Sequence, residues 1–291
     1  MATRREFLVQ AAAIQVLGSV PAARAASARN LIVRHDRLFL DARVNGRPVR
    51  ALLDSAAEAS FADARFAQRI GIVGAQSVRA RGSGGDTEAR MAEGVTIEAL
   101  GFTLHPEAIA VLDLSDVGAR LLHGPLDFVL GRELFDAGKL FIDIDAGRMR
   151  RLKANEHPAG VQLALTTEKG LETFPTSVEG HAEVGAAFDL GNGGGVLVGA
   201  DYAKAIGLLT DGRPIVMESG GGIGGARPRQ TIKLRTLKVA GREFAGVTAA
   251  IDTTGSATKL NIGVQVLRHF RIVTDFPGHR LWLESRNPSI N

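Results

Sequence analysis

The sequence has no cysteine and few aromatic residues. Among its 291 residues there is one Trp and one Tyr, and aromatic residues make up 5% of the chain. The lack of cysteine excludes thiol catalysis and disulfide cross-links. None of the seven histidines falls in an H-E-x-x-H or similar spacing, so a catalytic metal has no support. A G-x-S-x-G sequence is also missing, which argues against a serine hydrolase of that type.

Neither positive nor negative residues are in large excess. Lys and Arg number 35 against 31 Asp and Glu, for a formal net charge of +4. Because no basic block is interleaved with aromatic residues, we expect no nucleic-acid partner. The apolar content of 45% is enough to bury one large core or two modest ones. The 35 glycines favour tight turns between short strands, so all-β is the expected fold class.

The N-terminus has the pattern of an export signal. Residues 3–8 carry a twin-arginine motif, an apolar run follows as far as Val20, and residues 23–25 form a cleavage site. We therefore predict a twin-arginine signal peptide over residues 1–25 and a periplasmic or secreted protein. The alternative is a short amphipathic helix or an uncleaved anchor. No later stretch has about 18 consecutive apolar residues, so no stable membrane insertion is expected after cleavage.

Four features occur twice along the chain in the same order, which indicates an internal duplication. First, an apolar strand ends at an aspartate, with residues 49–53 before Asp54 and residues 184–188 before Asp189. Second, a short helix ends on an Ile-Gly-aliphatic sequence, at residues 70–72 and again at residues 206–208. Glycine at that position suits a helix C-terminus.

The third and fourth features complete the repeat. Glycine-rich segments follow in both halves and are predicted to form the tips of hairpin flaps. Their glycines are Gly82, Gly84 and Gly85 in one half, and Gly222, Gly224 and Gly225 in the other. Each half then closes with a Leu-Gly or Ile-Gly run, 77 residues after Asp54 at Gly131 and 74 residues after Asp189 at Gly263. We predict two domains, residues 30–153 and 160–286, joined by a linker near residues 153–159.

This pattern resembles the retropepsin-like aspartic proteases, specifically bacterial exported members with two fused copies. The resemblance implies an all-β fold of two duplicated retropepsin-like (acid protease) barrels related by pseudo-two-fold symmetry, with a few short helices. It implies that Asp54 and Asp189 are catalytic. Their loops would be supported by Ser55, Ala56, Leu190, Gly191 and Asn192, and backed by Leu130-Gly131 and Ile262-Gly263. Because one chain supplies both aspartates, a monomer is expected to suffice.

The resemblance implies an aspartic endopeptidase that acts on a peptide or protein substrate and needs no metal or cofactor. Two carboxylates close together cannot both ionise, so they share a proton. One can then act as a general base on a water while the other polarises the scissile carbonyl. The pair has two macroscopic pKa values, so an acidic optimum is expected.

Three departures from the family pattern support an alternative function. Ala56 replaces the usual glycine, at a cost on the order of 1 kcal/mol if its turn needs a positive φ. Leu190 replaces the hydroxyl residue that hydrogen-bonds across to the opposite loop, with Asn192 as a possible polar substitute. The only tyrosine, Tyr202, follows the second aspartate and does not lie in a flap. The alternative is a catalytically impaired protease-fold protein that binds peptides or a cell-envelope partner without cutting them.

Overall fold

The structure is a computed structural model, and it describes residues 30–286 apart from residues 256 and 258. The predicted signal peptide lies outside the described residues, so its assignment stays a prediction. The described chain consists mainly of short β-strands, with six short helices among them. None of the described helices combines the length and the apolar character needed to cross a membrane.

The first half of the chain forms a ten-stranded sheet. Its strand order is β5-β6-β9-β4-β10-β3-β2-β7-β8, with β1 added beside β2. The strands are β1 (Leu31–Arg34), β2 (Arg37–Val44), β3 (Arg47–Leu53), β4 (Phe61–Asp63), β5 (Gln76–Gly82), β6 (Gly85–Ala92), β7 (Ile97–Ala99), β8 (Phe102–Leu104), β9 (Ile109–Leu112) and β10 (Phe128–Leu130). Within this sheet β10 runs parallel to β3, which brings the ends of these two strands together.

The second half forms another ten-stranded sheet with the order β18-β19-β22-β17-β23-β16-β15-β20-β21, and β14 added beside β15. The strands are β14 (Thr166–Glu168), β15 (Leu171–Val178), β16 (Val184–Phe188), β17 (Val196–Gly199), β18 (Val216–Gly220), β19 (Arg227–Leu234), β20 (Leu237–Val239), β21 (Arg242–Phe244), β22 (Val247–Asp252) and β23 (Leu260–Ile262). Each strand occupies the place of its counterpart in the first sheet. The all-β, duplicated fold is therefore confirmed.

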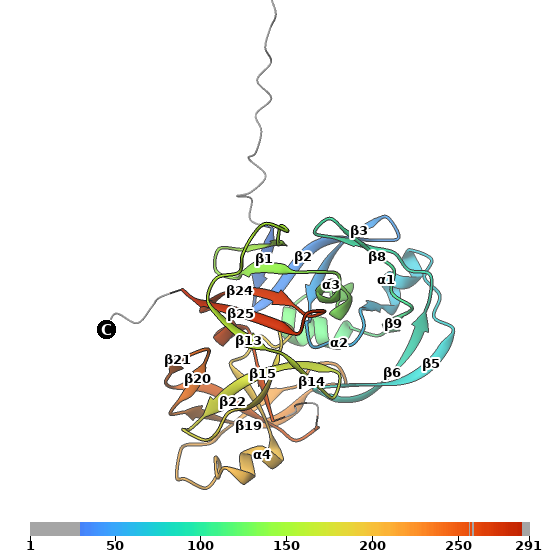
Figure 1. Cartoon of the computed structure of the whole chain (residues 1–291). Coiled ribbons are helices and arrows are strands. Elements are labelled where there is room, and N and C mark those ends of the chain that lie inside the picture. The colour runs from blue at the N-terminus through green and yellow to red at the C-terminus, as the bar shows by residue number, and fades with distance from the viewer. Residues whose placement is uncertain (1–29, 256, 258, 287–291) are drawn as a thin grey trace, which may run out of the picture.

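A third sheet joins the two halves. Its order is β12-β11-β24-β25-β13, and every pair is antiparallel. The strands are β11 (Leu140–Asp143), β12 (Arg148–Arg151), β13 (Val161–Ala164), β24 (Phe270–Asp275) and β25 (Arg280–Ser285). In Figure 1, β24, β25 and β13 lie between the first half, drawn in blue to green, and the second half, drawn in yellow to orange. The predicted linker runs between β12 and β13.

The six helices are short and sit at the ends of strands. They are α1 (Ala64–Arg69), α2 (Ser115–Val117), η1 (Gly118–Leu122), α3 (Arg132–Asp136), α4 (Ala200–Ala205) and α5 (Val264–Leu267). The Asp63 carboxylate caps α1 by accepting hydrogen bonds from the amides of Arg65 and Phe66. Just beyond α1 and α4, Gly71 and Gly207 have φ angles of +74° and +68°. These angles explain the glycines after the two predicted helices, because a side chain is strained in that conformation.

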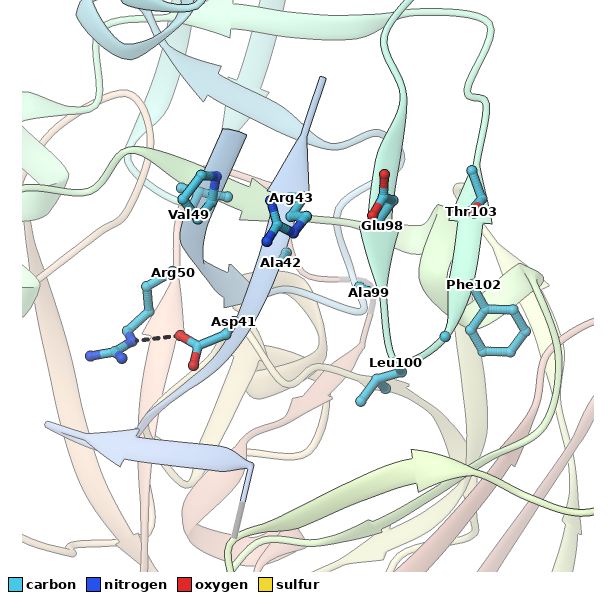
Figure 2. A pocket seen from close by; sticks show the side chains of 12 residues that line it. Asp41, Ala42, Arg43, Val49, Arg50, Glu98, Ala99, Leu100, Phe102 and Thr103 are labelled. Atoms are coloured by element: carbon cyan, nitrogen blue, oxygen red, sulfur yellow. Dashed lines mark hydrogen bonds and ion pairs between the residues drawn. The ribbon is translucent and has the colours of Figure 1, made fainter. Parts of the chain in front are cut away.

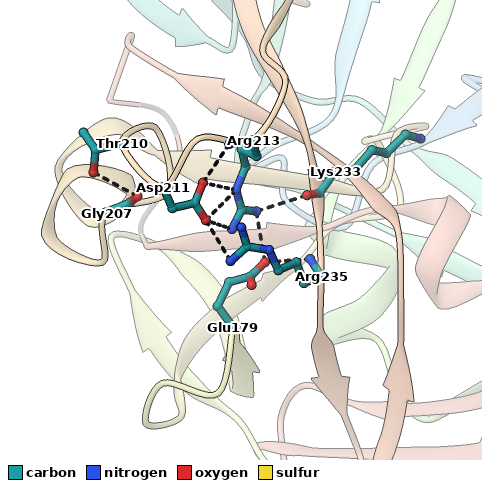
Figure 3. A network of polar contacts seen from close by, with 7 residues as sticks. All are labelled: Glu179, Gly207, Thr210, Asp211, Arg213, Lys233 and Arg235. Atoms are coloured by element: carbon teal, nitrogen blue, oxygen red, sulfur yellow. Dashed lines mark hydrogen bonds and ion pairs between the residues drawn. The ribbon is translucent and has the colours of Figure 1, made fainter.

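A polar network fastens the base of the second flap, the β18–β19 hairpin. Arg213, in the segment that leads into β18, donates to Glu179 Oε1 at 3.0 Å and to the carbonyl of Lys233 at 3.0 Å. The same guanidinium pairs with Asp211, and its hydrogen bond lowers the pKa of that carboxyl. Figure 3 shows these groups converging from the β15–β16 turn, the segment after α4, and β19. The base of this flap is therefore held by several ionic contacts at once.

One apolar core runs through both halves and the joining sheet. At its centre Phe276, which follows β24 and is 1% exposed, stacks on Phe135 of α3 with ring centroids 5.3 Å apart. The same ring meets Phe188 of β16 edge-on at 6.2 Å. Phe276 thus links an element of each half to the joining sheet.

We expect Phe276→Ala to lower the free energy of unfolding by about 3–5 kcal/mol, because it leaves a cavity where the halves meet. Guanidinium denaturation at equilibrium measures the loss. Phe141→Ala, at a half-buried phenylalanine of β11, is the matched control and should cost less. Equal losses for the two variants would contradict a special role for Phe276 at the junction.

Candidate active site

Both predicted aspartates lie directly after a strand that is paired in parallel with the closing strand of its half. Asp54 follows β3, and its amide donates to the carbonyl of Leu130 at 3.0 Å. Asp189 follows β16, and its amide donates to the carbonyl of Ile262 at 3.2 Å. In each half the Leu-Gly or Ile-Gly segment thus lies behind the aspartate loop, in the arrangement that the sequence predicted.

The glycines of these backing segments are required by close backbone contacts. A Cβ on Gly131 would lie 2.8 Å from the carbonyl of Ala59, and a Cβ on Gly263 would lie 2.5 Å from the carbonyl oxygen of Asn192. Separations below 3 Å between such atoms are not tolerated without movement of the backbone. The amide of Val264 also donates to Asn192 O at 2.8 Å, which fixes the second loop against its backing segment.

The two aspartate loops, which are 135 residues apart in sequence, meet through Ser55. Its buried hydroxyl donates to the carbonyl of Phe188 at 2.8 Å and accepts from the amide of Leu190 at 2.9 Å. Leu190 occupies the equivalent place in the second loop, is fully buried, and has no hydroxyl to return these bonds. The cross-loop connection is therefore made from one side only, as the sequence indicated.

The second loop also packs against the first carboxylate. A Cβ on Gly191 would lie 2.5 Å from Asp54 Oδ2. Only glycine fits there without displacing the carboxylate. At the equivalent position of the first loop stands Ala56, which is not among the residues with a positive φ. The strain considered for Ala56 therefore does not arise, because its backbone is in a region open to alanine.

The two carboxylates receive unequal numbers of hydrogen bonds. Asp54 Oδ1 accepts one from the amide of Ala56 at 3.0 Å. Asp189 Oδ1 accepts from the amides of Gly191 at 2.7 Å and Asn192 at 2.9 Å. Asp189 Oδ2 accepts a further bond from Asn261 Nδ2 at 2.6 Å. Because hydrogen bonds stabilise the ionised form, the environment of Asp189 favours a carboxylate more than that of Asp54.

The pKa values follow from burial and from these bonds. Burial and, to a lesser extent, the negative charge of Asp189 together raise the pKa of Asp54 to about 7. Burial also raises the pKa of Asp189, while Asn261 and the two loop amides oppose the shift. Asp189 is therefore the carboxyl that ionises first, and Asp54 keeps its proton up to near-neutral pH.

Two residues at this site were missed in the sequence. Asn261, 5% exposed, bridges the loop to the carboxylate by accepting from Asn192 Nδ2 at 2.8 Å and donating to Asp189. Its signal was present, because Asn261 stands in the second closing run where the first has the apolar Val129. Arg37 is the other, since its guanidinium lies near both aspartates and tends to lower their pKa values. An arginine that begins a strand carries no signal of this kind.

The predicted flap glycines lie at the tips of the β5–β6 and β18–β19 hairpins, and the two tips are in contact. The amide of Gly84 donates to the carbonyl of Ile223 at 2.8 Å, and Arg227 Nε donates to the carbonyl of Gly84 at 2.7 Å. Arg120 of η1 donates to the carbonyl of Gly222 at 3.0 Å. A Cβ on Gly82, Gly84 or Gly224 would meet the facing tip within 3 Å. These glycines are therefore needed for the close approach of the two flaps.

The predicted residues thus fall into two groups. Asp54, Ser55, Asp189, Leu190, Gly191 and Asn192 surround the junction of the loops, with Ala56 beside Asp54, and the six flap glycines lie where the hairpin tips meet. A pocket of about 680 Å³ elsewhere is lined by β2, β3 and the β7–β8 hairpin, with the Arg50–Asp41 ion pair at its edge (Figure 2). Neither Asp54 nor Asp189 lines this pocket. Within the described residues no group of three His, Asp or Glu side chains is placed to hold a metal ion.

Comparison with known proteins points to the same family. Residues 40–134, which include Asp54 and its backing segment, match the family model described as aspartyl protease. The similarity to the aspartyl protease family thus covers about a third of the chain, within its first half. A crystal structure of a retropepsin-like aspartic protease from Rickettsia conorii is similar at 16% identity and a TM-score of 0.34, over 42% of this chain and 88% of that one. Comparison with curated proteins gives no match.

The family match ends before the second half of the chain. The strand order of the second sheet, identical to that of the first, extends the protease-like architecture to residues 166–262. The first half therefore contains the segment that matches the family, and the second half has the same sheet topology. Asp54 belongs to the first half and Asp189 to the second.

The one-sided connection between the loops can be tested by restoring the missing hydroxyl. By the pseudo-symmetry, a threonine at position 190 would donate to the carbonyl of Leu53 as Ser55 donates to that of Phe188. We expect Leu190→Thr to be more stable than Leu190→Val, which has the same shape without the hydroxyl, by about 1 kcal/mol in chemical denaturation. A less stable threonine variant would show that the second half of the connection cannot form.

The raised pKa of Asp54 predicts that the stability of the folded protein falls as pH rises. Protons bind the folded state more tightly than the unfolded state, so this stabilisation is complete below about pH 4 and is lost as pH rises towards 7. We expect Asp54→Asn to raise the melting temperature by several degrees at pH 8 and less at pH 4.5. Asp41→Asn, at an exposed carboxylate, is the control. A lower melting temperature for Asp54→Asn at pH 8 would contradict the assignment.

Proposed function

We propose that the protein is an aspartic endopeptidase in which Asp54 and Asp189 share one proton and activate a water molecule. The observation that carries the proposal is that two half-buried carboxyls with raised pKa values, one from each half, lie on loops joined by Ser55. Their unequal hydrogen bonding supports distinct roles for the two groups. The family of residues 40–134 supports peptide hydrolysis as the reaction class.

The roles follow from the order of ionisation. Asp189, the carboxylate, takes a proton from the water, whose oxygen attacks the peptide carbonyl carbon. Asp54, which holds the shared proton, donates a hydrogen bond to the carbonyl oxygen and stabilises the negative charge that develops there. The tetrahedral intermediate collapses when its C–N bond breaks and the amine nitrogen receives a proton from the pair. No metal or cofactor takes part in these steps.

Substrate binding in this proposal requires the flaps to separate. The tips are joined by hydrogen bonds between Gly84 and Ile223 and between Arg227 and Gly84. An extended peptide entering below them would replace these bonds by pairing with backbone groups of the flaps, as peptides do when they add to a sheet edge. We further propose that the protein acts after export, in the periplasm or outside the cell.

A second candidate function is peptide binding without cleavage. Its support is Leu190, because a dyad connected from one side only is less firmly positioned, and errors near 1 Å can lower a rate about a hundredfold. Under this proposal the aspartate loops and the flaps still hold a ligand, and the partner is a peptide or a cell-envelope protein. The two candidates differ in whether a bound peptide is hydrolysed.

Cleavage of a broad peptide library by the purified protein between pH 3 and pH 8 tests the proposal. We expect hydrolysis that is favoured by acid and declines as pH rises through about 7, because Asp54 then loses the shared proton. Asp54→Asn and Asp189→Asn should each lower kcat/KM by about a hundredfold or more. Asp41→Asn should leave it unchanged.

Two outcomes would count against an endopeptidase. If the folded protein cleaves nothing across this range but binds peptides, the binding function replaces it. If hydrolysis persists in both asparagine variants, the activity does not come from this pair of carboxyls.

A further inference from the structure

The guanidinium of Arg37 lies against the second aspartate loop without a polar partner. Arg37 is the first residue of β2 and is half-buried. Its Nη1 occupies the place that a Cβ on Gly193 would take. Within the part of the chain that the structure describes, this guanidinium makes no hydrogen bond and no ion pair. Burial lowers the pKa of Arg37, and the nearby charges of Asp189, Asp54 and Asp36 oppose that shift, so the guanidinium has carboxylates near it but no hydrogen-bond partner among the described residues.

The duplication shows what Arg37 lacks. In the β1–β2 hairpin Arg37 pairs with Arg34, and in the β14–β15 hairpin the equivalent pair is Leu171 with Glu168. Each hairpin packs on the aspartate loop of the other half. Four residues after Asp54 the first loop has Glu58, whose carboxylate lies against Gly170 of the β14–β15 turn.

In the second loop the position equivalent to Glu58 is Gly193. The first loop thus has Glu58, but the facing hairpin has Leu171 at the position equivalent to Arg37. The second loop has Gly193, and the facing hairpin has Arg37. The neighbouring Asp36 does not replace the missing carboxylate. Its side chain pairs with Arg268 at 3.3 Å and accepts from Gln265 at 3.3 Å.

The unpaired guanidinium is close to the catalytic pair. Gly191 packs on the carboxylate of Asp54, and Gly193 packs on Arg37. Two steps of backbone span at most about 7 Å, so the glycine Cα atoms that touch these groups are no farther apart than that. The guanidinium nevertheless forms no ion pair with either aspartate. If a peptide binds at the pair as proposed, this guanidinium lies close to the residues next to its scissile bond.

We propose that Arg37 is a specificity-determining residue that binds a carboxylate of the peptide, either an acidic side chain or a free C-terminus. The planar guanidinium with its paired N–H donors matches a carboxylate in two hydrogen bonds, and Gly193 leaves room for it. This inference rests on the proposed function, because it places a peptide between the two halves. It goes further by naming the chemistry that the site selects.

The test uses statine-containing peptides, which bind aspartic proteases without being cleaved, and the full chain. In one series each of the four positions on either side of the statine is in turn Glu or Gln. In a second series the peptide ends in a free carboxylate or in an amide. Titration calorimetry measures the affinities, so the result does not depend on turnover.

We expect the unaltered protein to bind at least one carboxylate peptide about tenfold more tightly than its amide partner. The preference should fall to about onefold in Arg37→Gln and return in part in Arg37→Lys. The control is Arg34→Gln, which removes the same charge from the cross-strand neighbour and should keep the preference. The series that shows the effect tells whether the carboxylate comes from a side chain or from the C-terminus.

The inference is overturned if the unaltered protein prefers no carboxylate peptide, if it binds neither series, or if the preference persists in folded Arg37→Gln. Hydrolysis of neutral library peptides without any carboxylate preference would remove this inference and leave the proposed function intact. A carboxylate preference in a protein that hydrolyses no peptide would support the role of Arg37 and rule out the endopeptidase.

Discussion

Two half-buried carboxyl groups lie at the junction of the two halves, and their like charges limit how both can be ionised. Both cannot ionise, so the protein must hold one as a carboxylate and the other as an acid. It does so by giving Asp189 three hydrogen bonds and Asp54 fewer from the surrounding loops. Each aspartate is placed by a parallel strand pair, β3 with β10 and β16 with β23. The duplication is what allows one chain to bring two such strand ends together.

The site is symmetric in its backbone and asymmetric in its side chains. Ser55 makes both cross-loop hydrogen bonds, while Leu190 fills the equivalent space with apolar atoms. Asn261 supports Asp189 where Val129 stands in the other half. Arg37 faces a glycine where its symmetric counterpart would face a glutamate. An internally duplicated protein can separate the two roles in this way, because each half is encoded independently, whereas a homodimer repeats every substitution twice.

The flaps couple the same two halves from the other side. Their tips meet through a backbone hydrogen bond from Gly84 to Ile223, through arginine side chains that donate to tip carbonyls, and through closely packed glycines. The base of the second flap is held by the ion pairs of Arg213, and its tip by hydrogen bonds to the first flap and to Arg120.

Local pattern was enough to predict much of this protein from its sequence. The strand-Asp, Ile-Gly, glycine-tip and Leu-Gly features each describe a short stretch of backbone. Their recurrence predicted the duplication, the two aspartate loops and a glycine-tipped hairpin in each half, whereas the contact between the hairpin tips came from the structure. The missing cross-loop hydrogen bond at Leu190 was predicted as well, because the lack of a hydroxyl is a property of that single residue.

What the tertiary structure alone decided depends on contacts between distant residues. The split in the pKa values of the two aspartates comes from burial and from Asn261, 72 residues from Asp189 along the chain. Ala56 is not strained because its φ angle is not positive. Arg37 lacks a hydrogen-bond partner in the described part of the chain because the residue facing it, 156 positions away in the sequence, is Gly193. The sequence by itself indicated the two aspartates, their loops and the flap glycines, but not Asn261 or Arg37. Folding decided their charges, because protonation responds to the surroundings of a group and not to its neighbours in the chain.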